Sequence, residues 1–495
     1  MDRLLEHLAS WKPFRALVVG DFMLDQLLYG DADRLSADAP VPILLVREQQ
    51  HRPGGAANLC LDLAELGGQV RAFGVRGNDD HGRVLVRELQ ARNIETTGLV
   101  VDTDPARPTT VKQNLIGRAQ ARHPQKMFRV DFESREPVGA ATAARLLGAF
   151  ELALADADVV CIEDYGKGVC TAELCQGVID RARRAGKPVM VDPARLDDYS
   201  RYRGATVITP NRTEAEFATG LPTCGDATVE KNGAVAQRLL DQLELEAAVL
   251  TLDRHGALLL ERGKGPVTVP TIARRVYDVT GAGDMFLAGL AAARANGCSW
   301  ADATRFANAA AGLEVEIFGV EPIPLEKIHH SLLQMSAAEH GKLRTLDQVM
   351  VEVAAARRAG KKVVFTNGCF DVLHAGHVTL LDHAASEGDV LVVGLNDDAS
   401  VRRLKGADRP VNHQEDRARV LGALGCVSAV VLFGEDTPMK LIEAIRPDVL
   451  VKGGDYTKDR VVGAEFVERH GGRVVVTGLV EGRSTTGTIR KMRGG

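Results

Sequence analysis

The sequence predicts an α/β protein that contains two successive domains. Short apolar runs with strand spacing alternate with helical patterns from residue 141 onward, and the same alternation resumes after residue 345. Polar, glycine-rich turns follow several of the predicted strands, as in parallel sheets whose strands are connected by helices. A chain of 495 residues is also too long for one hydrophobic core, so at least two domains are expected.

The composition is typical of a soluble globular protein. Hydrophobic residues make up 45% of the chain and charged residues 26%, and the formal net charge of −5 argues against a nucleic-acid or membrane surface as partner. No apolar run is long enough to span a membrane, and residues 1–14 lack the apolar core of a signal peptide. None of the eight cysteines forms a Cys-x-x-Cys pair, which indicates reduced thiols. We therefore expect a cytoplasmic protein that binds neither nucleic acid nor membrane.

The most informative motif is Asp278-Val-Thr-Gly-Ala-Gly-Asp284, which lies between an extended segment and an apolar helix. Gly281 and Gly283 flank Ala282 and have no Cβ, so backbone N–H groups can approach a phosphate at the positive end of the helix. Asp284 is then placed to accept a proton from a hydroxyl that attacks this phosphate. The alternative is an ordinary glycine-rich helix start with Asp as N-cap. The whole motif at a strand-to-helix turn favours phosphoryl transfer.

This motif resembles the signature of the ribokinase-like (PfkB) carbohydrate kinases, and the resemblance extends over roughly residues 14 to 320. It implies a ribokinase-like αβα domain with a β lid over the sugar. In that family the Gly-Ala-Gly turn forms an anion hole and its Asp, here Asp284, is the catalytic base. ATP and Mg²⁺ would be the nucleotide and the metal. No Gly-x-x-x-x-Gly-Lys-[Ser/Thr] run occurs, so a P-loop kinase is the weaker interpretation.

Two further segments match the sugar-binding elements of these kinases. Asp21 ends an apolar strand and Asp25 lies four residues beyond it, so both carboxylates are candidates for binding sugar hydroxyls. Gly54, Gly55 and Asn58 lie at a helix start, where the glycines permit close approach and the amide offers both a donor and an acceptor. Helix capping alone is the alternative for this second segment.

Residues 96–134 show strand patterns without helices between them, in the runs 98–102, 109–115 and 127–132. The family resemblance implies that such strands build the lid. Four basic side chains of this region are candidates for binding a substrate phosphate, although charges at a lid edge are commonly solvated: Lys112, Arg118, Arg122 and Arg129.

A nucleotide site is predicted where Asn211-Arg212-Thr213-Glu214 follows another strand. Asn and Glu three residues apart at a helix start can form a simple capping pair. In the PfkB family, Asn-x-x-Glu organises magnesium and the phosphate waters. The resemblance therefore implies that Asn211, Arg212 and Thr213 lie at the nucleotide and that Glu214 acts on Mg²⁺ through waters. Asn308 is a weaker candidate for the same pocket.

Regular patterning fades between residues 318 and 345. We therefore place the first domain at residues 1–335, a linker at 336–345 and the second domain at 346–495. In the second domain Thr345 caps a predicted helix, and strands are predicted at 363–366, 389–395, 427–433 and 448–452. This alternation indicates a smaller, Rossmann-like α/β domain.

His374 and His377 form the only His-x-x-His pair in the chain, at a predicted helix start after the first strand of the second domain. A zinc site is the alternative, but it would need a third ligand. The stretch resembles the His-x-Gly-His nucleotidyltransferases, and Ser484, Thr485 and Thr486 resemble the second signature of that family. The resemblance implies that the histidines stabilise charge on the α-phosphate of a nucleotide as pyrophosphate leaves. Further candidates for binding the nucleotide are Phe370, Lys405, Arg409, Arg417 and Lys452.

The residues themselves indicate a sugar or polyol kinase joined to a nucleotidyltransferase. The domain order and four runs resemble a family of bifunctional enzymes that activate heptose phosphates for lipopolysaccharide synthesis. These runs are Ala39-Pro-Val-Pro42, Arg52-Pro-Gly-Gly-Ala-Ala-Asn58, Tyr277-Asp-Val-Thr-Gly-Ala-Gly-Asp284 and Arg409-Pro-Val-Asn412.

The resemblance implies two reactions. In the first, ATP phosphorylates heptose 7-phosphate at the anomeric O1 to give the 1,7-bisphosphate. In the second, adenylyl transfer from ATP to heptose 1-phosphate gives ADP-heptose and pyrophosphate. Sugar phosphates and ATP are thus the expected partners, and pairing of lid strands implies a homodimer. The alternatives are another sugar kinase fused to a polyol-phosphate cytidylyltransferase, and a sugar-phosphate sensor with inactive sites.

Overall fold

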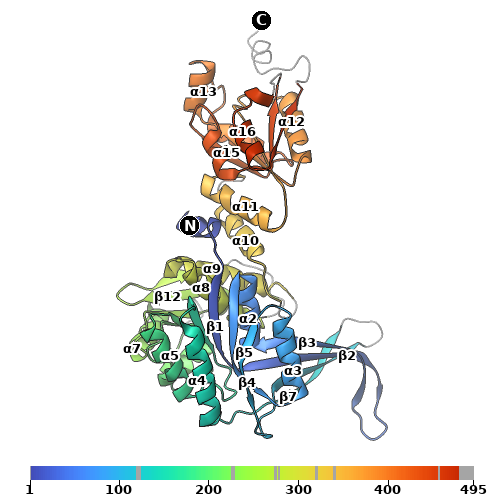
Figure 1. Cartoon of the computed structure of the whole chain (residues 1–495), viewed down its shortest axis with the longest axis vertical. Helices are drawn as coiled ribbons and strands as arrows, with labels where there is room; N and C mark the ends of the chain where they lie inside the picture. Colours follow the sequence, from blue (N-terminus) through green and yellow to red (C-terminus); the bar gives the residue numbers. More distant parts are fainter. Residues whose placement is uncertain are drawn as a thin grey trace. The chain divides into compact units, whose positions relative to one another are not determined.

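The computed structural model describes residues 2–118, 124–223, 229–271, 276, 279–317, 321–337, 342–454 and 458–478 (Figure 1). The chain forms two compact units. The larger unit is Lys12–Ile328, and the smaller unit combines Met1–Trp11 with His329–Gly495. No helix of the described residues is long and apolar enough to cross a membrane.

A nine-stranded sheet forms the centre of the larger unit, as far as its described residues show. Its strands are, in spatial order, β13 (Val267–Val269), β12 (Ala257–Glu261), β11 (Ala247–Thr251), β10 (Val207–Ile208), β9 (Val189–Asp192), β8 (Val159–Glu163), β1 (Phe14–Gly20), β4 (Gly68–Gly77) and β5 (Glu95–Asp102). Strands β11 to β5 are parallel, and β12 and β13 form an antiparallel edge. The strand order reverses between β1 and β8, and ligands bind at such a switch point in open α/β sheets.

Helices cover both faces of this sheet, as expected for an αβα domain. One face packs against α4 (Ala140–Leu154), α5 (Ala172–Arg184) and α7 (Val229–Gln242), which contribute apolar side chains to one continuous core. The other face packs against α2 (Ala56–Glu65), α8 (Ala282–Ala295) and α9 (Trp300–Glu314). The remaining helices of this unit are α3 (Asp80–Gln90) and α6 (Arg212–Thr219), with 3₁₀ turns at Ser200–Tyr202 and Asp253–His255. Helix α8 is buried from Asp284 to Ala293, which explains why its sequence is apolar on all sides.

A separate four-stranded sheet forms the lid, in the order β3 (Pro42–Gly55), β2 (Phe22–Leu35), β6 (Thr110–Arg118) and β7 (Gln125–Phe132). One predicted lid strand lies elsewhere, and one lid strand was not predicted. The run 98–102 belongs to β5 in the central sheet, so it is not a lid strand. The long strand β2 was not anticipated, because its polar residues and glycine mask the alternation of a strand.

The described part of the smaller unit contains a parallel sheet of six strands, with the order reversing between β15 and β18. Its strands are β14 (Leu343–Arg344), β17 (Ala429–Phe433), β16 (Val390–Asn396), β15 (Val363–Gly368), β18 (Val449–Gly453) and β19 (Arg473–Thr477). Its helices are α11 (Leu346–Arg358), α12 (Ala375–Ser386), α13 (Asp398–Lys405), α14 (Gln414–Ala423), α15 (Met439–Ile445) and α16 (Ala464–Arg469), with a 3₁₀ turn at Lys458–Arg460. Two apolar clusters, one on each face of the sheet, complete this Rossmann-like unit.

The first helix of the chain, α1 (Asp2–Ala9), packs against α11 in the smaller unit. Leu4 and Leu8 are fully buried there, and the ring of Trp11 lies edge-on to His329 with ring centroids 6.2 Å apart. No pattern in the sequence indicates that the chain begins in one unit and then enters the other. Helix α10 (Leu325–Ala337) runs into the predicted linker, whose residues 338–341 lie outside the described part of the chain. The functional boundary at 336–345 stays a prediction.

Candidate active sites

Asp284, the expected catalytic base, lies in the first turn of α8 and is 4% exposed. Its carboxylate accepts two hydrogen bonds, from the Tyr165 hydroxyl to Oδ1 at 2.7 Å and from the Asn58 amide to Oδ2 at 2.8 Å. Burial raises the pKa of Asp284 to about 6, although both hydrogen bonds and the charge of Lys112 favour the charged form. The group is therefore ionised at neutral pH and still a stronger base than an exposed aspartate.

The glycines before α2 allow the chain to approach this site closely. A Cβ on Gly54 would lie 2.7 Å from Oδ2 of Asp25, and Gly55 has a φ of +56° with its Cβ position 2.7 Å from the Asp21 carbonyl oxygen. Only glycine tolerates both conditions, and the turn then directs Asn58 to Asp284. The structure thus brings together Asp25, Gly54, Asn58 and Asp284.

Asp21 has a different role from the one expected. Its carboxylate accepts hydrogen bonds from the backbone N–H groups of Tyr165, Lys167 and Val169, at 2.9, 3.0 and 3.2 Å. It is 1% exposed, and these three hydrogen bonds hold the loop after β8 in place. By fixing Tyr165, it acts on the base indirectly. Asp25 remains as the aspartate available to a substrate.

Basic lid residues surround Asp25. Lys112 lies opposite Asp25 in the pairing of β2 with β6, and its Nζ is 5.1 Å from the ring centroid of Tyr165. Burial raises the pKa of Asp25, and the charges of Lys112, Arg129, Lys126 and Arg52 oppose this shift. Lys126 and Arg52 were not among the expected residues.

The other expected phosphate ligands of the lid region are arginines. Arg118 lies over the ring of Tyr29, with its Cζ 5.8 Å from the centroid, and Arg122 lies outside the described residues. Arg129 pairs with Asp131 at 2.8 Å, and residues two apart in a strand lie on the same face.

A cluster of buried carboxylates lies beside the base. Oxygen atoms of Glu163, Asp192 and Asp284 lie within 4.8 Å of one another. Burial and mutual repulsion raise the pKa values of Glu163 and Asp192 well above their usual range, and Glu214 contributes to both shifts. Oε2 of Glu163 is buried without a hydrogen-bond partner. Such a set of hard oxygen donors fits a divalent cation such as Mg²⁺, which would relieve the repulsion.

The turn at the start of α8 fits an anion. Gly281 is the N-cap with a φ of +89°, Ala282 begins the helix, and a Cβ on Gly283 would lie 3.3 Å from Oδ2 of Asp192. The N-cap carries no side chain that could occupy the amides of the first turn. Among the described residues no side chain caps this helix start, which suits a phosphate beside the carboxylate cluster.

Asn211 and Glu214 form a capping pair at the start of α6, which was one of the two interpretations of this segment. The Asn211 side chain accepts from the Glu214 N–H at 3.1 Å, and Glu214 Oε2 accepts from the Asn211 N–H at 2.9 Å. Burial raises the pKa of Glu214. The residue caps α6, and its charge also acts on Asp192 in the carboxylate cluster. Capping and a role at the metal are thus compatible.

The remaining nucleotide candidates lie around this helix start and α9. Arg212 bonds to Thr223 at 3.1 Å and approaches Asp253 at 3.4 Å, whereas Thr213 is exposed. Asn308 on α9 bonds to Thr271 and to the carbonyl of Pro270, so it fixes the end of the β13 segment.

In the smaller unit, His374 and His377 lie at the start of α12, just beyond the carboxyl end of β15. Their rings stack with centroids 3.9 Å apart, and Phe370 approaches His377 edge-on at 5.2 Å. Burial, together with His374, lowers the pKa of His377 to about 4, so His377 is neutral at physiological pH. Phe370 has a φ of +42°, a strained conformation that is common at ligand sites. Among the described residues, no third metal ligand joins the two histidines.

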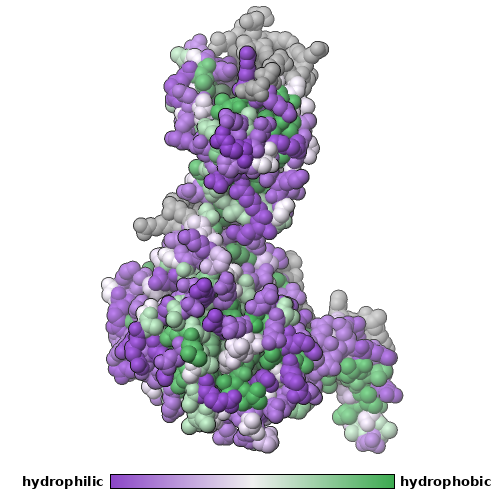
Figure 2. Space-filling view, viewed as in Figure 1, coloured by the Kyte–Doolittle hydropathy of each residue, from purple (hydrophilic) through white to green (hydrophobic). Residues whose placement is uncertain are grey.

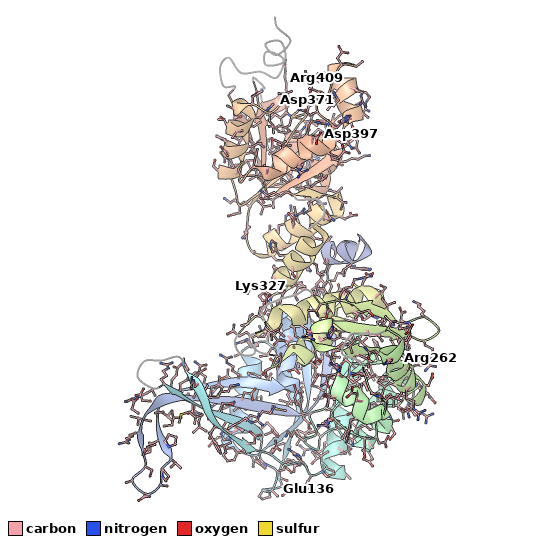
Figure 3. The ribbon with its side chains drawn as sticks, turned by 180° about the vertical axis from the view of Figure 1, so that it is seen from behind. Glu136, Arg262, Lys327, Asp371, Asp397 and Arg409 are labelled. Carbon is pink, nitrogen blue, oxygen red and sulfur yellow. The ribbon has the colours of Figure 1, made fainter. Side chains whose placement is uncertain are left out.

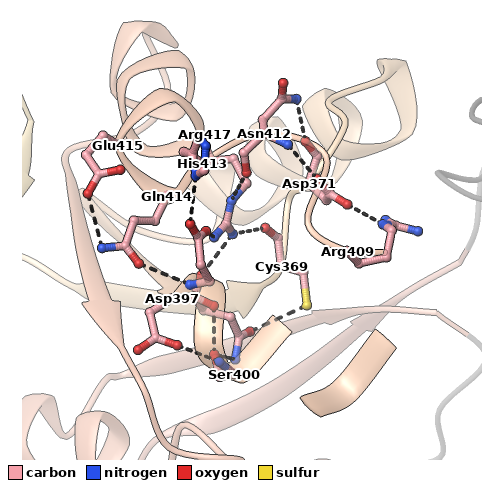
Figure 4. Close-up of polar contacts among 12 residues, drawn as sticks. Cys369, Asp371, Asp397, Ser400, Arg409, Asn412, His413, Gln414, Glu415 and Arg417 are labelled. Atoms are coloured by element: carbon pink, nitrogen blue, oxygen red, sulfur yellow. Dashed lines mark hydrogen bonds and ion pairs between the residues drawn. The ribbon is translucent and has the colours of Figure 1, made fainter. Parts of the chain in front are cut away.

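These histidines line a cavity of about 920 Å³ together with Phe370, Lys405, Arg409 and Lys452. Lys452 at the end of β18 donates to the carbonyl and side-chain oxygens of Asn367 at 3.2 and 3.1 Å, and burial lowers its pKa. Arg409 pairs with the buried carboxylate of Asp371, which also accepts from the backbone of Val411 at 2.6 Å (Figures 3 and 4). The cavity has the volume and the cationic lining of a nucleotide site.

Arg417 does not fit the phosphate-binding role. It is 2% exposed, and its guanidinium donates to the carbonyls of Cys369, Asn396 and Asn412 and to the carboxylate of Asp398 (Figure 4). All three nitrogens are therefore occupied by the protein, and the residue ties together the loops at the ends of β15 and β16. Ser484, Thr485 and Thr486 lie outside the described residues, as do Tyr277 and Asp278.

Sequence reasoning missed several residues of these sites: Tyr165, Glu163, Asp192 and Asp371. Glu163 and Asp192 each lie at the carboxyl end of a strand in the central sheet, and this position at the sheet edge was the available signal. Tyr165 and Asp371 act through contacts across the fold, which spacing along the chain does not reveal.

Comparison with known proteins agrees with this architecture. The profile of the pfkB family carbohydrate kinases matches residues 14–327, and a profile described as cytidylyltransferase-like matches residues 365–480. The bifunctional protein HldE of Geobacter sulfurreducens is 46% identical over 477 residues, which cover 96% of this chain and 95% of that protein. The bifunctional protein HldE of Caulobacter vibrioides is 44% identical over 495 residues, or 99% of this chain and 100% of that protein.

Solved structures resemble the larger unit in fold. Phosphofructokinase-2 from Escherichia coli in complex with potassium has a TM-score of 0.52 at 18% identity, and covers 66% of this chain and 100% of its own. A putative ribokinase from Agrobacterium tumefaciens has a TM-score of 0.51 at 23% identity, with 66% and 99% covered. The ribokinase-like fold of the larger unit and the bifunctional architecture expected from the sequence are thereby confirmed. The chain belongs to the family of bifunctional HldE proteins, in which a pfkB-type carbohydrate kinase is joined to a cytidylyltransferase-like nucleotidyltransferase.

Proposed function

We propose that this enzyme carries out two steps in the synthesis of ADP-heptose for the lipopolysaccharide core. The kinase uses ATP to phosphorylate O1 of heptose 7-phosphate, and the transferase moves the adenylyl group of ATP onto heptose 1-phosphate. The observation that carries the proposal is the identity of 41% to 46% with HldE proteins over nearly the whole chain. We assign the kinase to residues 1–335 and the transferase to residues 346–495. Both reactions use cytoplasmic metabolites, and we infer that the protein works there without nucleic acid as partner.

At the kinase site, Asp284 takes the proton of the anomeric hydroxyl as O1 attacks the γ-phosphate of ATP. Tyr165 and Asn58 hold the carboxylate by their hydrogen bonds, and the open start of α8 receives phosphate oxygens. Asp25, with Gly54 beside it, is positioned for the sugar hydroxyls. The basic lid residues Lys112 and Arg129 suit the 7-phosphate, since together with Lys126 and Arg52 they place positive charge beside Asp25.

The carboxylate cluster fits Mg²⁺, with Asp192 and Glu163 as direct candidates and Glu214 acting through waters. The ion would neutralise charge on the ATP phosphates.

Asp192→Asn should raise the Mg²⁺ concentration needed for half-maximal kinase rate by at least tenfold, because it removes a negative charge from the cluster. Adenylyl transfer, measured in the same preparation, is the control. An unchanged Mg²⁺ requirement would place the ion elsewhere.

At the transferase site, an oxygen of the sugar 1-phosphate attacks the α-phosphate of ATP. The stacked histidines donate to the α-phosphate, and Lys405, Arg409 and Lys452 balance the charge of the departing pyrophosphate. Neutral His377 can donate from only one ring nitrogen, so its orientation matters. Ser484, Thr485 and Thr486 are assigned to the same phosphates by resemblance alone. Pyrophosphate release with CTP as fast as with ATP would favour the cytidylyltransferase alternative.

A second copy of the chain is the proposed partner of the lid. Leu35, Val41, Leu45 and Val46 on β2, β3 and the turn between them are each more than 40% exposed, and Phe128 on β7 is 69% exposed. Apolar surface gathers on the projecting arm of these strands (Figure 2), and such a patch marks an interface in soluble proteins.

We expect a dimer by light scattering at micromolar concentration. Leu45→Asp should shift it to a monomer, and a monomeric parent protein would contradict the proposal.

The role of Asp284 predicts both a mutant phenotype and a pH dependence. Asp284→Asn keeps the shape but removes the proton acceptor, so kinase kcat should fall roughly 10²- to 10⁴-fold. In the parent protein the kinase needs the ionised carboxylate. Kinase kcat/KM should therefore be full above pH 7 and fall as the pH drops through about 6, the raised pKa of Asp284. Initial rates of ADP release between pH 4.5 and 8.5 measure both effects.

The control for this variant is the other site of the same chain. Asp284→Asn should leave adenylyl transfer within a factor of about two, while His377→Ala should lower it roughly 10²- to 10³-fold and spare the kinase. A fall of less than about tenfold in kinase kcat for Asp284→Asn would show that another group is the base.

The two reactions together predict where synthesis stops. The kinase product is a 1,7-bisphosphate, whereas the transferase substrate carries a phosphate only at O1. A transferase pocket that suits a neutral 7-hydroxyl would have to desolvate a second dianion without a partner, which costs several kcal/mol. Given ATP and heptose 7-phosphate, the pure enzyme should therefore accumulate the bisphosphate in phosphorus NMR spectra. ADP-heptose should appear only after a separate 7-phosphatase is added, and its formation at full rate without one would refute this order.

A further inference from the structure

A second buried carboxyl group lies behind the base of the kinase site. Asp62 on α2 is fully buried, and its Oδ2 accepts a hydrogen bond from Nδ2 of Asn58 at 3.3 Å. The same nitrogen donates to Oδ2 of Asp284 at 2.8 Å. Asn58 and Asp62 are four residues apart on one helix, so their side chains lie on the same face. The amide of Asn58 is thus held between two acceptors.

The amide group of Asn58 has two N–H donors on one side and a carbonyl oxygen on the other. The two N–H groups are both used, one by each carboxyl group. If the amide turned over, its oxygen would face the acceptors of Asp62 and Asp284, and both hydrogen bonds would be lost. A single acceptor at Asp284 would leave the second N–H buried and unpaired, which costs free energy and loosens the orientation.

We propose that Asp62 is a positioning residue of the kinase: by accepting the second N–H of Asn58, it fixes that amide so that the other N–H stays on the catalytic base Asp284. This inference rests on the proposed kinase function. Asp62 itself touches neither substrate nor phosphate, and it acts only through Asn58. The hydrogen bond to Asp284 keeps the carboxylate in place for proton transfer, and its loss would lower kcat.

The surroundings of Asp62 affect its protonation state, and thereby the form in which it accepts the hydrogen bond from Asn58. Burial raises the pKa of Asp62 well above its usual range, and the charges of Glu314 on α9 and of Asp284 add to the shift. The buried surroundings therefore favour the protonated, neutral form of this side chain. Its Oδ1 has no hydrogen-bond partner, while Oδ2 accepts from Asn58. A neutral acid that accepts through one oxygen has nearly the shape and polarity of an asparagine amide.

Because of this similarity, two substitutions of Asp62 can test whether its hydrogen-bond acceptor is needed. Asp62→Asn keeps an acceptor for Asn58, whereas Asp62→Leu has a similar volume and no acceptor. We expect Asp62→Asn to retain kinase kcat within about twofold and Asp62→Leu to lose about tenfold or more, the scale of one lost hydrogen bond in the transition state. The KM for ATP should change little in both variants. Glu65→Leu, an exposed carboxylate on the same helix, is the matched control and should resemble the parent.

A double-mutant cycle separates positioning from a general effect on stability. In an Asn58→Ala background, Asp62→Leu should cause no further loss of kcat, because the group through which it acts is gone. Rates are measured with heptose 7-phosphate on preparations that circular dichroism and gel filtration show to be as fully folded as the parent, so unfolded protein does not account for a loss of kcat. If Asp62→Leu does not fold, Asp62→Ala replaces it in the same cycle.

Three outcomes would overturn the proposal. Parental kcat in Asp62→Leu would show that the acceptor is unnecessary, and equal losses in Asp62→Asn and Asp62→Leu would show that the acid itself matters. Additive losses in the Asn58→Ala background would show that Asp62 acts by another route. Failure of the proposed function is distinguishable, since the parent protein would then not phosphorylate heptose 7-phosphate at all.

Discussion

The kinase site depends on one constraint: a carboxylate must remain ionised in a buried place that is already crowded with carboxyl groups. Asp284 meets it because Tyr165 and Asn58 donate hydrogen bonds to its two oxygens, and these bonds oppose the effect of burial on its pKa. Much of the surrounding structure serves these two donors. Asp21 fixes the loop that carries Tyr165, and Gly54 and Gly55 let the chain turn so that α2 presents Asn58.

In the transferase site, positive charges are likewise held in place by hydrogen-bond partners from the protein. Lys452 and Arg409 are partly buried cations that line the cavity, and each has a protein acceptor, Asn367 and Asp371 respectively. Their positions are therefore set before a nucleotide arrives, and charge on a departing pyrophosphate meets groups that need little reorganisation. Both sites lie where the strand order reverses, at β1 and β8 in one sheet and at β15 and β18 in the other.

The sequence predicted the two α/β units, most of their central strands and the motifs at both sites, because these depend on local periodicity and on glycines at turns. It also brought Asn58 and Asp284 into one hypothesis, and their side chains are in contact. It missed β2, whose polar residues hide the strand pattern, and it missed the packing of α1 on α11. Such features arise from contacts between distant segments, as does the contact of Tyr165 with Asp284 across 119 positions.

Residue type also fails to separate groups that bind ligands from groups that hold the protein together. Asp21 and Asp25 follow the same strand, yet Asp21 already accepts three backbone N–H groups, whereas Asp25 stays half-buried among basic side chains. Arg409 and Arg417 show the same contrast, because only Arg417 has all three nitrogens bonded to protein oxygens. Hydrogen-bond capacity that the protein leaves unused is therefore the property that distinguishes a candidate ligand from a structural residue, and it exists only in the folded chain.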